Sequence, residues 1–80
     1  MTLDILPIGR KARIVAVDWT RLDEDEGRRL RALGIDQGAR VAVARRGVFG
    51  GADPIALEIG RMTVALRRGH AAAMQVEELA

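Results

Sequence analysis

The sequence predicts a mainly β protein, a small and partly open barrel of about five strands with one short α-helix after the first strand. Two patterns in its 80 residues favour this fold class. Apolar and polar residues alternate over several short segments, which is the period of a β-strand, and turn residues separate those segments. A sheet that curls on itself also removes edges that so short a chain could not cover. We therefore expect a single domain, residues 1–80.

An arm should precede the first strand. Pro7 and Gly9 favour turns in the segment LDILPIGRKA, and Leu3, Leu6 and Ile8 are available for docking.

The following segment, ARIVAVDW, alternates and contains several β-branched residues, so it predicts a strand. Both of its faces should be partly covered. One face is expected to carry Ala12, Ile14 and Ala16, and the other Arg13, Val15 and Val17.

A helix is predicted from Glu24 to Leu33. Leu22, Leu30 and Leu33 lie within one helical stripe, with acidic residues first and arginines after them, as the helix dipole favours. Asp23 with Glu26 makes a plausible N-cap pair, and Thr20 with Asp23 is a second choice.

Glycines mark both the weak point and the end of this helix. Gly27 costs about 1 kcal/mol relative to alanine inside a helix, so packing must hold it there. Gly34 suits the left-handed residue after the helix, and Ile35 would then fold back onto Leu30 in a Schellman cap.

The second half of the chain predicts the remaining strands. After a turn at IDQG, ARVAVARR is expected to be a strand, and the glycine-rich GVFGGADP a loop. IALEI and MTVALRR should pair through a tight turn at Gly60 and Arg61. GHAAA then forms one helical turn and MQVEEL a last strand. An SH3-like, partly open barrel accounts for this order most economically.

The basic character of the chain is weaker than its pI of about 10.4 suggests. Thirteen basic and eleven acidic side chains leave a net charge of +2, and twelve of the basic residues are arginines. The densest basic region combines Arg28, Arg29 and Arg31 with Arg45 and Arg46. Nucleic-acid binding is less favoured, because the chain has only two large aromatic rings for stacking.

No catalytic or metal-binding motif stands out. The sequence has no cysteine, serine or tyrosine, and its single histidine, His70, has only Glu77 and Glu78 as near acids. The acidic run at residues 23–26 lacks the alternate spacing of a calcium loop. We expect no catalytic residue, no metal ligand and no cofactor.

Val48 and Phe49 lie in the glycine-rich loop, which lacks the lysine and the following helix of a phosphate-binding loop. These two side chains either fold over the core or present an apolar patch to a partner. The start of the chain lacks the order of a secretory signal, and no apolar run could span a bilayer, so a cytoplasmic protein is expected.

Several segments together resemble the FeoA family, small proteins associated with bacterial ferrous iron uptake. Leu6, Pro7, Gly9, Ala12 and Ile14 match first, followed by RRLRALGIDQGARVAV, GADPIALEIG and VALRRGHAAAMQV. The resemblance runs from Leu3 to Val76. The acidic segment DWTRLDEDEG departs from it, in a linker that varies within the family.

The resemblance implies an SH3-like barrel that is not an enzyme and that contacts the cytoplasmic side of the membrane transporter FeoB. Similar domains stand at the end of the chain in iron-dependent repressors of the diphtheria toxin repressor family. It implies architectural roles for Gly34, Gly38, Asp53 and Pro54, and no metal ligands.

We expect a cytoplasmic accessory protein whose partner-binding residues are Arg28, Arg29, Arg31, Val48 and Phe49. Weak self-association is compatible with exposed apolar residues in the loop. The alternatives are a metal-responsive regulatory module and a nucleic-acid-binding barrel.

Overall fold

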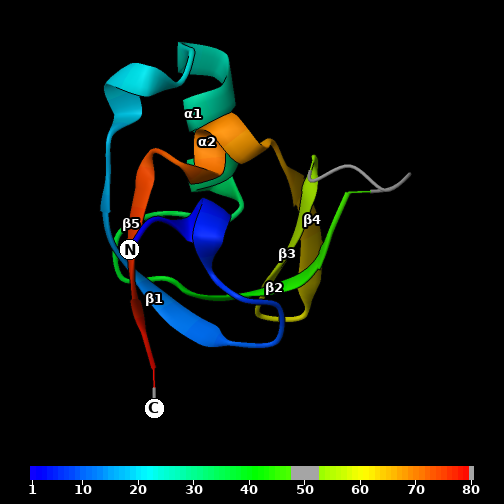
Figure 1. Cartoon of the computed structure of the whole chain (residues 1–80). Helices are drawn as coiled ribbons and strands as arrows, with labels where there is room; N and C mark the ends of the chain where they lie inside the picture. The colour runs from blue at the N-terminus through cyan, green and yellow to red at the C-terminus, as the bar shows by residue number, and fades with distance from the viewer. Residues whose placement is uncertain (48–52, 80) are drawn as a thin grey trace.

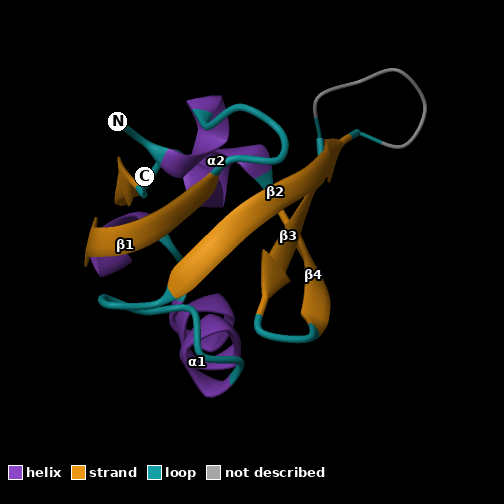
Figure 2. Ribbon diagram, turned by 90° about the horizontal axis from the view of Figure 1, so that it is seen from below, coloured by secondary structure: helices purple, strands orange, loops and turns teal. Residues whose placement is uncertain are grey.

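The computed structural model describes residues 1–47 and 53–79, which form one antiparallel sheet with two α-helices and two 3₁₀ turns. The strands lie in the order β4-β3-β2-β1-β5. Figure 2 shows β2 crossing the middle of the sheet, with β1 on one side and β3 and β4 on the other. The strand bounds are β1 Lys11–Val17, β2 Arg40–Arg46, β3 Ile55–Ile59, β4 Met62–Leu66 and β5 Met74–Glu78. The predicted fold class, an open five-stranded sheet with a short helix, is confirmed.

Helix α1, Glu24–Ala32, follows β1, and the single-turn helix α2, Arg68–Ala71, joins β4 to β5. Both helices lie at the same end of the barrel (Figure 1). The 3₁₀ turns η1, Leu3–Ile5, and η2, Trp19–Arg21, precede β1 and α1 respectively. The first strand therefore ends at Val17, and Trp19 lies in η2 rather than in the strand.

The ends of α1 follow local rules. The Asp23 carboxylate accepts a hydrogen bond from the Glu26 backbone N–H at 2.8 Å, which makes Asp23 the N-cap. At the other end, the Ile35 N–H donates to the Leu30 carbonyl at 2.9 Å, and Gly34 has a φ of +92°. This is the predicted Schellman cap, and it requires the left-handed conformation that glycine adopts without strain. The helix ends at Ala32, one residue before the predicted end.

A bulge in β1 corrects the predicted faces of this strand. The pairing with β5 shifts register between Ile14 and Ala16, so the alternation changes phase there. Ala12 and Ile14 are fully buried as predicted, but Ala16 is exposed and Val17 packs against the core instead. Strand β2 has a second irregularity between Val43 and Arg45. Bulges bend strands and increase their twist, which favours a sheet that curls.

The hairpin of β3 and β4 is the one predicted. Ile59 pairs with Met62 across the two-residue turn Gly60-Arg61, and Gly60 has a φ of +59°. A positive φ at the first turn residue alone is the pattern of a type II′ turn.

The core is aliphatic and takes in the N-terminal arm. Leu3 and Leu6 are completely buried, as predicted, whereas Ile8 is 56% exposed and does not dock. Ile5, on the same arm, is 59% exposed. The buried set is Leu3, Leu6, Ala12, Ile14, Leu22, Leu30, Ile35, Val41, Val43, Ile55, Leu57, Val64, Leu66, Ala71, Ala73, Met74 and Val76.

Candidate interaction surface

The three arginines predicted on α1 do not form one patch. Arg28 points into solvent, 66% exposed, and pairs with Glu24 at 3.2 Å. The Arg29 Nε lies 2.5 Å from Glu26 Oε1. Arg31 instead stacks its guanidinium on the ring of Trp19, 4.6 Å from the ring centroid.

Helix geometry explains this division. Successive residues turn by about 100° in an α-helix, so Arg29 and Arg31 project from opposite flanks with Arg28 between them. One flank faces β4, where the Arg29 Nη2 reaches the Ala65 carbonyl oxygen at 3.5 Å. The other flank faces η2, where the Trp19 ring also lies 3.5 Å from the position that a Cβ on Gly27 would occupy. Gly27 is buried and packs against Trp19, which agrees with the expectation that packing holds this glycine in the helix.

The two other predicted partner-binding residues, Val48 and Phe49, lie outside the described residues. The ends of their loop are held by two hydrogen bonds. The Gly47 N–H donates to the Pro54 carbonyl at 2.8 Å, and the Asp53 carboxylate accepts from the Arg68 N–H at 2.9 Å. The Asp53–Pro54 peptide bond is cis. These contacts fit the architectural role that the family resemblance implies for Asp53 and Pro54.

Arg46 has a structural partner that the sequence did not indicate. Its guanidinium donates hydrogen bonds to the backbone carbonyls of Asp4 and Leu6, which fastens the N-terminal arm to β2. The neighbouring Arg45 is exposed on the sheet. The basic pair at 45 and 46 thus divides between a structural and a surface position. No local sequence signal marks the difference, because the contact spans about forty residues.

His70 lies beside an acid far away in the sequence. Its Nδ1 is 3.8 Å from Glu26 Oε2, each side chain is 19% exposed, and Nδ1 has no hydrogen-bond partner. Glu77 and Glu78, its nearest acids in sequence, pair instead with Arg13 and Arg10. Across residues 1–47 and 53–79, no group of three or more His, Cys, Asp or Glu side chains is placed to hold a metal ion.

The fold and this distribution of side chains define the class of protein. It is a small, SH3-like open barrel whose charged groups are spread over an outer surface. The FeoA domain family model matches residues 1–78, and the chain belongs to the FeoA family, which is associated with ferrous iron transport.

Solved structures of similar proteins agree with this assignment. The chain is 31% identical to the FeoA protein of Chlorobium tepidum, with a TM-score of 0.85 over 100% of this chain and 71% of that chain. It is 32% identical to FeoA of Stenotrophomonas maltophilia complexed with zinc, described as a prokaryotic SH3 domain protein, with a TM-score of 0.78 over 96% and 89%.

A third similar structure is the iron(II) transport protein A of Clostridium thermocellum, at 25% identity and a TM-score of 0.82. The alignment covers 99% of this chain but 46% of that one, so the present chain spans less than half the length of that protein. No sequence among the curated proteins matches the chain. None of the helices in the described part of the chain has the length and apolar character needed to cross a membrane.

Proposed function

We propose that this protein is a cytoplasmic, non-enzymatic accessory protein of ferrous iron transport that acts by contacting the cytoplasmic side of an FeoB-type membrane transporter. Family membership supports the link to ferrous iron transport. The Stenotrophomonas maltophilia relative is itself described as a factor that could activate this transport.

The observation that carries the contact is the number of basic side chains without an acidic partner. Four of the thirteen basic side chains form ion pairs with carboxylates of the described residues, so nine have no such partner there. These nine are Lys11, Arg21, Arg31, Arg40, Arg45, Arg46, Arg61, Arg67 and Arg68. Seven of the eleven acidic side chains likewise have no basic partner among the described residues, so the remaining excess is the net charge of +2. An excess of this sign favours an acidic protein partner through long-range attraction.

A nucleic acid fits this surface less well. Single-stranded nucleic acids bind by stacking bases on aromatic rings along a basic groove. Trp19 is the only large aromatic residue among the described ones, and its ring already stacks against the Arg31 guanidinium. The affinity for a nucleic acid would also fall steeply as the salt concentration rises. An affinity that does not change with salt would exclude nucleic-acid binding.

Binding to the purified soluble cytoplasmic domain of the transporter, measured by calorimetry, tests the proposal. A triple variant, Arg28→Glu, Arg31→Glu and Phe49→Ala, should weaken binding at least tenfold. The matched control, Arg10→Glu, Arg40→Glu and Ile8→Ala, changes the same charge and also removes an apolar side chain, and should change affinity less than threefold. A folded triple variant that binds normally would remove α1 and the loop as the contact surface. No binding by the unaltered protein would contradict the function itself.

A metal-responsive regulatory module is the second candidate. The observation in its favour is the unpartnered His70 Nδ1 beside Glu26, together with the zinc complex of the Stenotrophomonas maltophilia relative. Two side chains fall short of the four ligands of a closed zinc site. Stoichiometric Zn²⁺ or Fe²⁺ binding that is lost in His70→Ala would favour this candidate. Metal binding that is the same in His70→Ala, or no metal binding by the unaltered protein, would exclude it.

A further inference from the structure

Strand β4 is one edge of the sheet, and part of its backbone has no partner strand among residues 1–47 and 53–79. Ile59 and Met62 close a two-residue hairpin, so this pair exchanges hydrogen bonds, and the bonded pairs then recur at every second residue. The intervening residues, Thr63 and Ala65, direct their N–H and C=O groups away from β3. Among the described residues, the contact made by these groups is the one from Arg29 to the Ala65 carbonyl, a weak bond at 3.5 Å.

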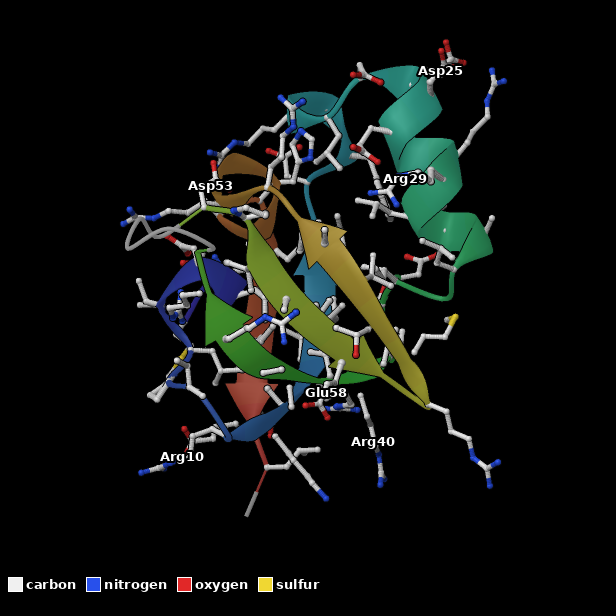
Figure 3. All side chains as sticks on the ribbon, turned by 90° about the vertical axis from the view of Figure 1, so that its right-hand side faces the viewer. Arg10, Asp25, Arg29, Arg40, Asp53 and Glu58 are labelled. Carbon is white, nitrogen blue, oxygen red and sulfur yellow. The ribbon has the colours of Figure 1, made fainter. Side chains whose placement is uncertain are left out.

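The surroundings of this edge are visible in Figure 3. Strand β4 runs along the side of the sheet that faces the viewer, and α1 lies above one end with Arg29 on the flank toward the sheet. The lower part of the edge has no described element beside it.

Two arginines bracket the free edge. Arg61 lies in the turn before β4, and Arg67 follows the strand with an extended backbone at φ −64° and ψ 140°. Both side chains are exposed, and neither has a carboxylate of the described residues within 4 Å. Five residues lie between them, and the six steps of extended chain from one to the other span about 20 Å.

These charges decide between two kinds of occupant. If two copies of β4 paired antiparallel through Thr63 and Ala65, Val64 would face its own copy and Arg61 would lie opposite Arg67 at both ends. Like charges directly opposite each other destabilise a strand pair. A second copy of this chain is therefore disfavoured, and a segment with acidic residues at both ends is favoured.

The inner face of the edge adds an apolar requirement. Met62 is 44% exposed, while the next inward residues, Val64 and Leu66, are buried. An added strand would place alternate side chains on this same face, since side-chain direction alternates along a strand. Apolar residues at those positions would cover Met62 and continue the core.

We propose that the free edge of β4 binds an extended segment of a partner protein by β-strand addition. Thr63 and Ala65 form the backbone hydrogen bonds. Arg61 and Arg67 pair with two acidic residues of the partner segment that lie about six positions apart. Between those acidic residues, every second residue of the segment is apolar and faces the core. The inference rests on the proposed function only in that the transporter is the first partner in which to look for such a segment.

Two synthetic peptides test this edge directly: EVTVTVE, and KVTVTVK as its charge-reversed match, both acetylated and amidated. The acidic peptide should bind at least tenfold more tightly than the basic one. It should also slow hydrogen exchange of the Thr63 and Ala65 amides at least tenfold, because both would become bonded. The amides of Val64 and Leu66, already bonded to β3, should change less than twofold.

Two variants separate recognition from folding. The double variant Arg61→Glu and Arg67→Glu alters exposed side chains only, and it should reverse the preference so that the basic peptide binds more tightly. Thr63→Pro removes an outward donor without touching the bonds to β3, and should abolish binding of both peptides. Exchange protection of β1 and β2 amides checks that each variant is folded.

The inference is overturned if neither peptide protects a β4 amide, or if the preference does not follow the charges. The two proposals can fail separately. A transporter domain that binds the folded double variant normally, with no peptide binding, would leave the proposed function and remove the edge. Peptide binding as expected, with no binding of the transporter domain, would leave the β4 edge as a binding site and remove the proposed function.

Discussion

The two edges of the sheet offer the same backbone chemistry and are treated in opposite ways. At the β5 edge, the N-terminal arm is present: Thr2 pairs with Gln75, and the Val76 N–H donates to the Met1 carbonyl at 2.8 Å. At the β4 edge, Thr63 and Ala65 direct their backbone groups outward, and the described part of the chain makes one weak contact with them. Figure 1 shows the blue arm beside β5, and β4 on the other side of the barrel.

This difference separates the edge that the fold itself covers from the edge that is available for binding. An open strand edge invites pairing, and proteins cover it, charge it or use it. Here the chain uses its own first residues to cover one edge and brackets the other with arginines. The covered edge should therefore be sensitive to mutation in stability, and the free edge in binding.

The largest expected effect is at the covered edge. Leu3→Ala removes a fully buried side chain of the arm and should lower the free energy of unfolding by about 2–5 kcal/mol. Ile5→Ala, two residues away and 59% exposed, is the matched control and should change it by less than about 0.5 kcal/mol. Urea unfolding measures both. Equal effects would mean that the arm is not part of the folded unit.

The next effect concerns the side chain that fastens this arm. Arg46→Met removes the hydrogen bonds to the Asp4 and Leu6 carbonyls and should cost about 1–3 kcal/mol. Arg45→Met changes the exposed neighbour and should remain within about 0.5 kcal/mol. Thermal unfolding compares the two variants. A larger loss in Arg45→Met would reverse the structural assignment of this pair.

A moderate effect is expected where α1 ends, because that cap orients the helix and its Arg29 over the β4 edge. Gly34→Ala places a side chain at a φ of +92° and should cost about 1–2 kcal/mol. Gly69→Ala is the control, since this helical glycine has no positive φ and open space around a Cβ. Denaturant midpoints should show loss in the first variant and none in the second.

The smallest effect on stability should be at the free edge itself. Arg29→Gln removes a half-exposed ion pair and a weak bond to Ala65, so unfolding should shift by less than about 0.5 kcal/mol. The change in the free energy of peptide binding should be larger than the change in the free energy of unfolding. A large loss in the free energy of unfolding would show instead that the main role of Arg29 is to hold the helix to the sheet.

Local rules predicted much of this fold, and their limits are visible at particular residues. The Asp23 cap, the Gly34 helix end and the Gly60-Arg61 hairpin depend on a few neighbouring residues, and all were predictable. The bulge after Ile14 was not, because strand alternation has no marker for an inserted residue. It moved Val17 to the core face.

The surface was less predictable than the fold. Counting arginines gave one basic region, but Arg31 stacks on Trp19 and Arg46 binds the arm, and both contacts depend on tertiary structure. The free edge of β4 was also missed, since strand order cannot be derived from the residues of one strand. A sequence signal did exist there, in the arginines on either side of MTVAL.

The most direct test of the account is hydrogen exchange of the protein alone and in complex with the soluble cytoplasmic domain of its transporter. In the complex, the amides of Thr63 and Ala65 should exchange at least tenfold more slowly than in the free protein. The amide of Val76, already bonded to Met1, should be unchanged. Protection that appears along β5 and leaves β4 unchanged would contradict the account.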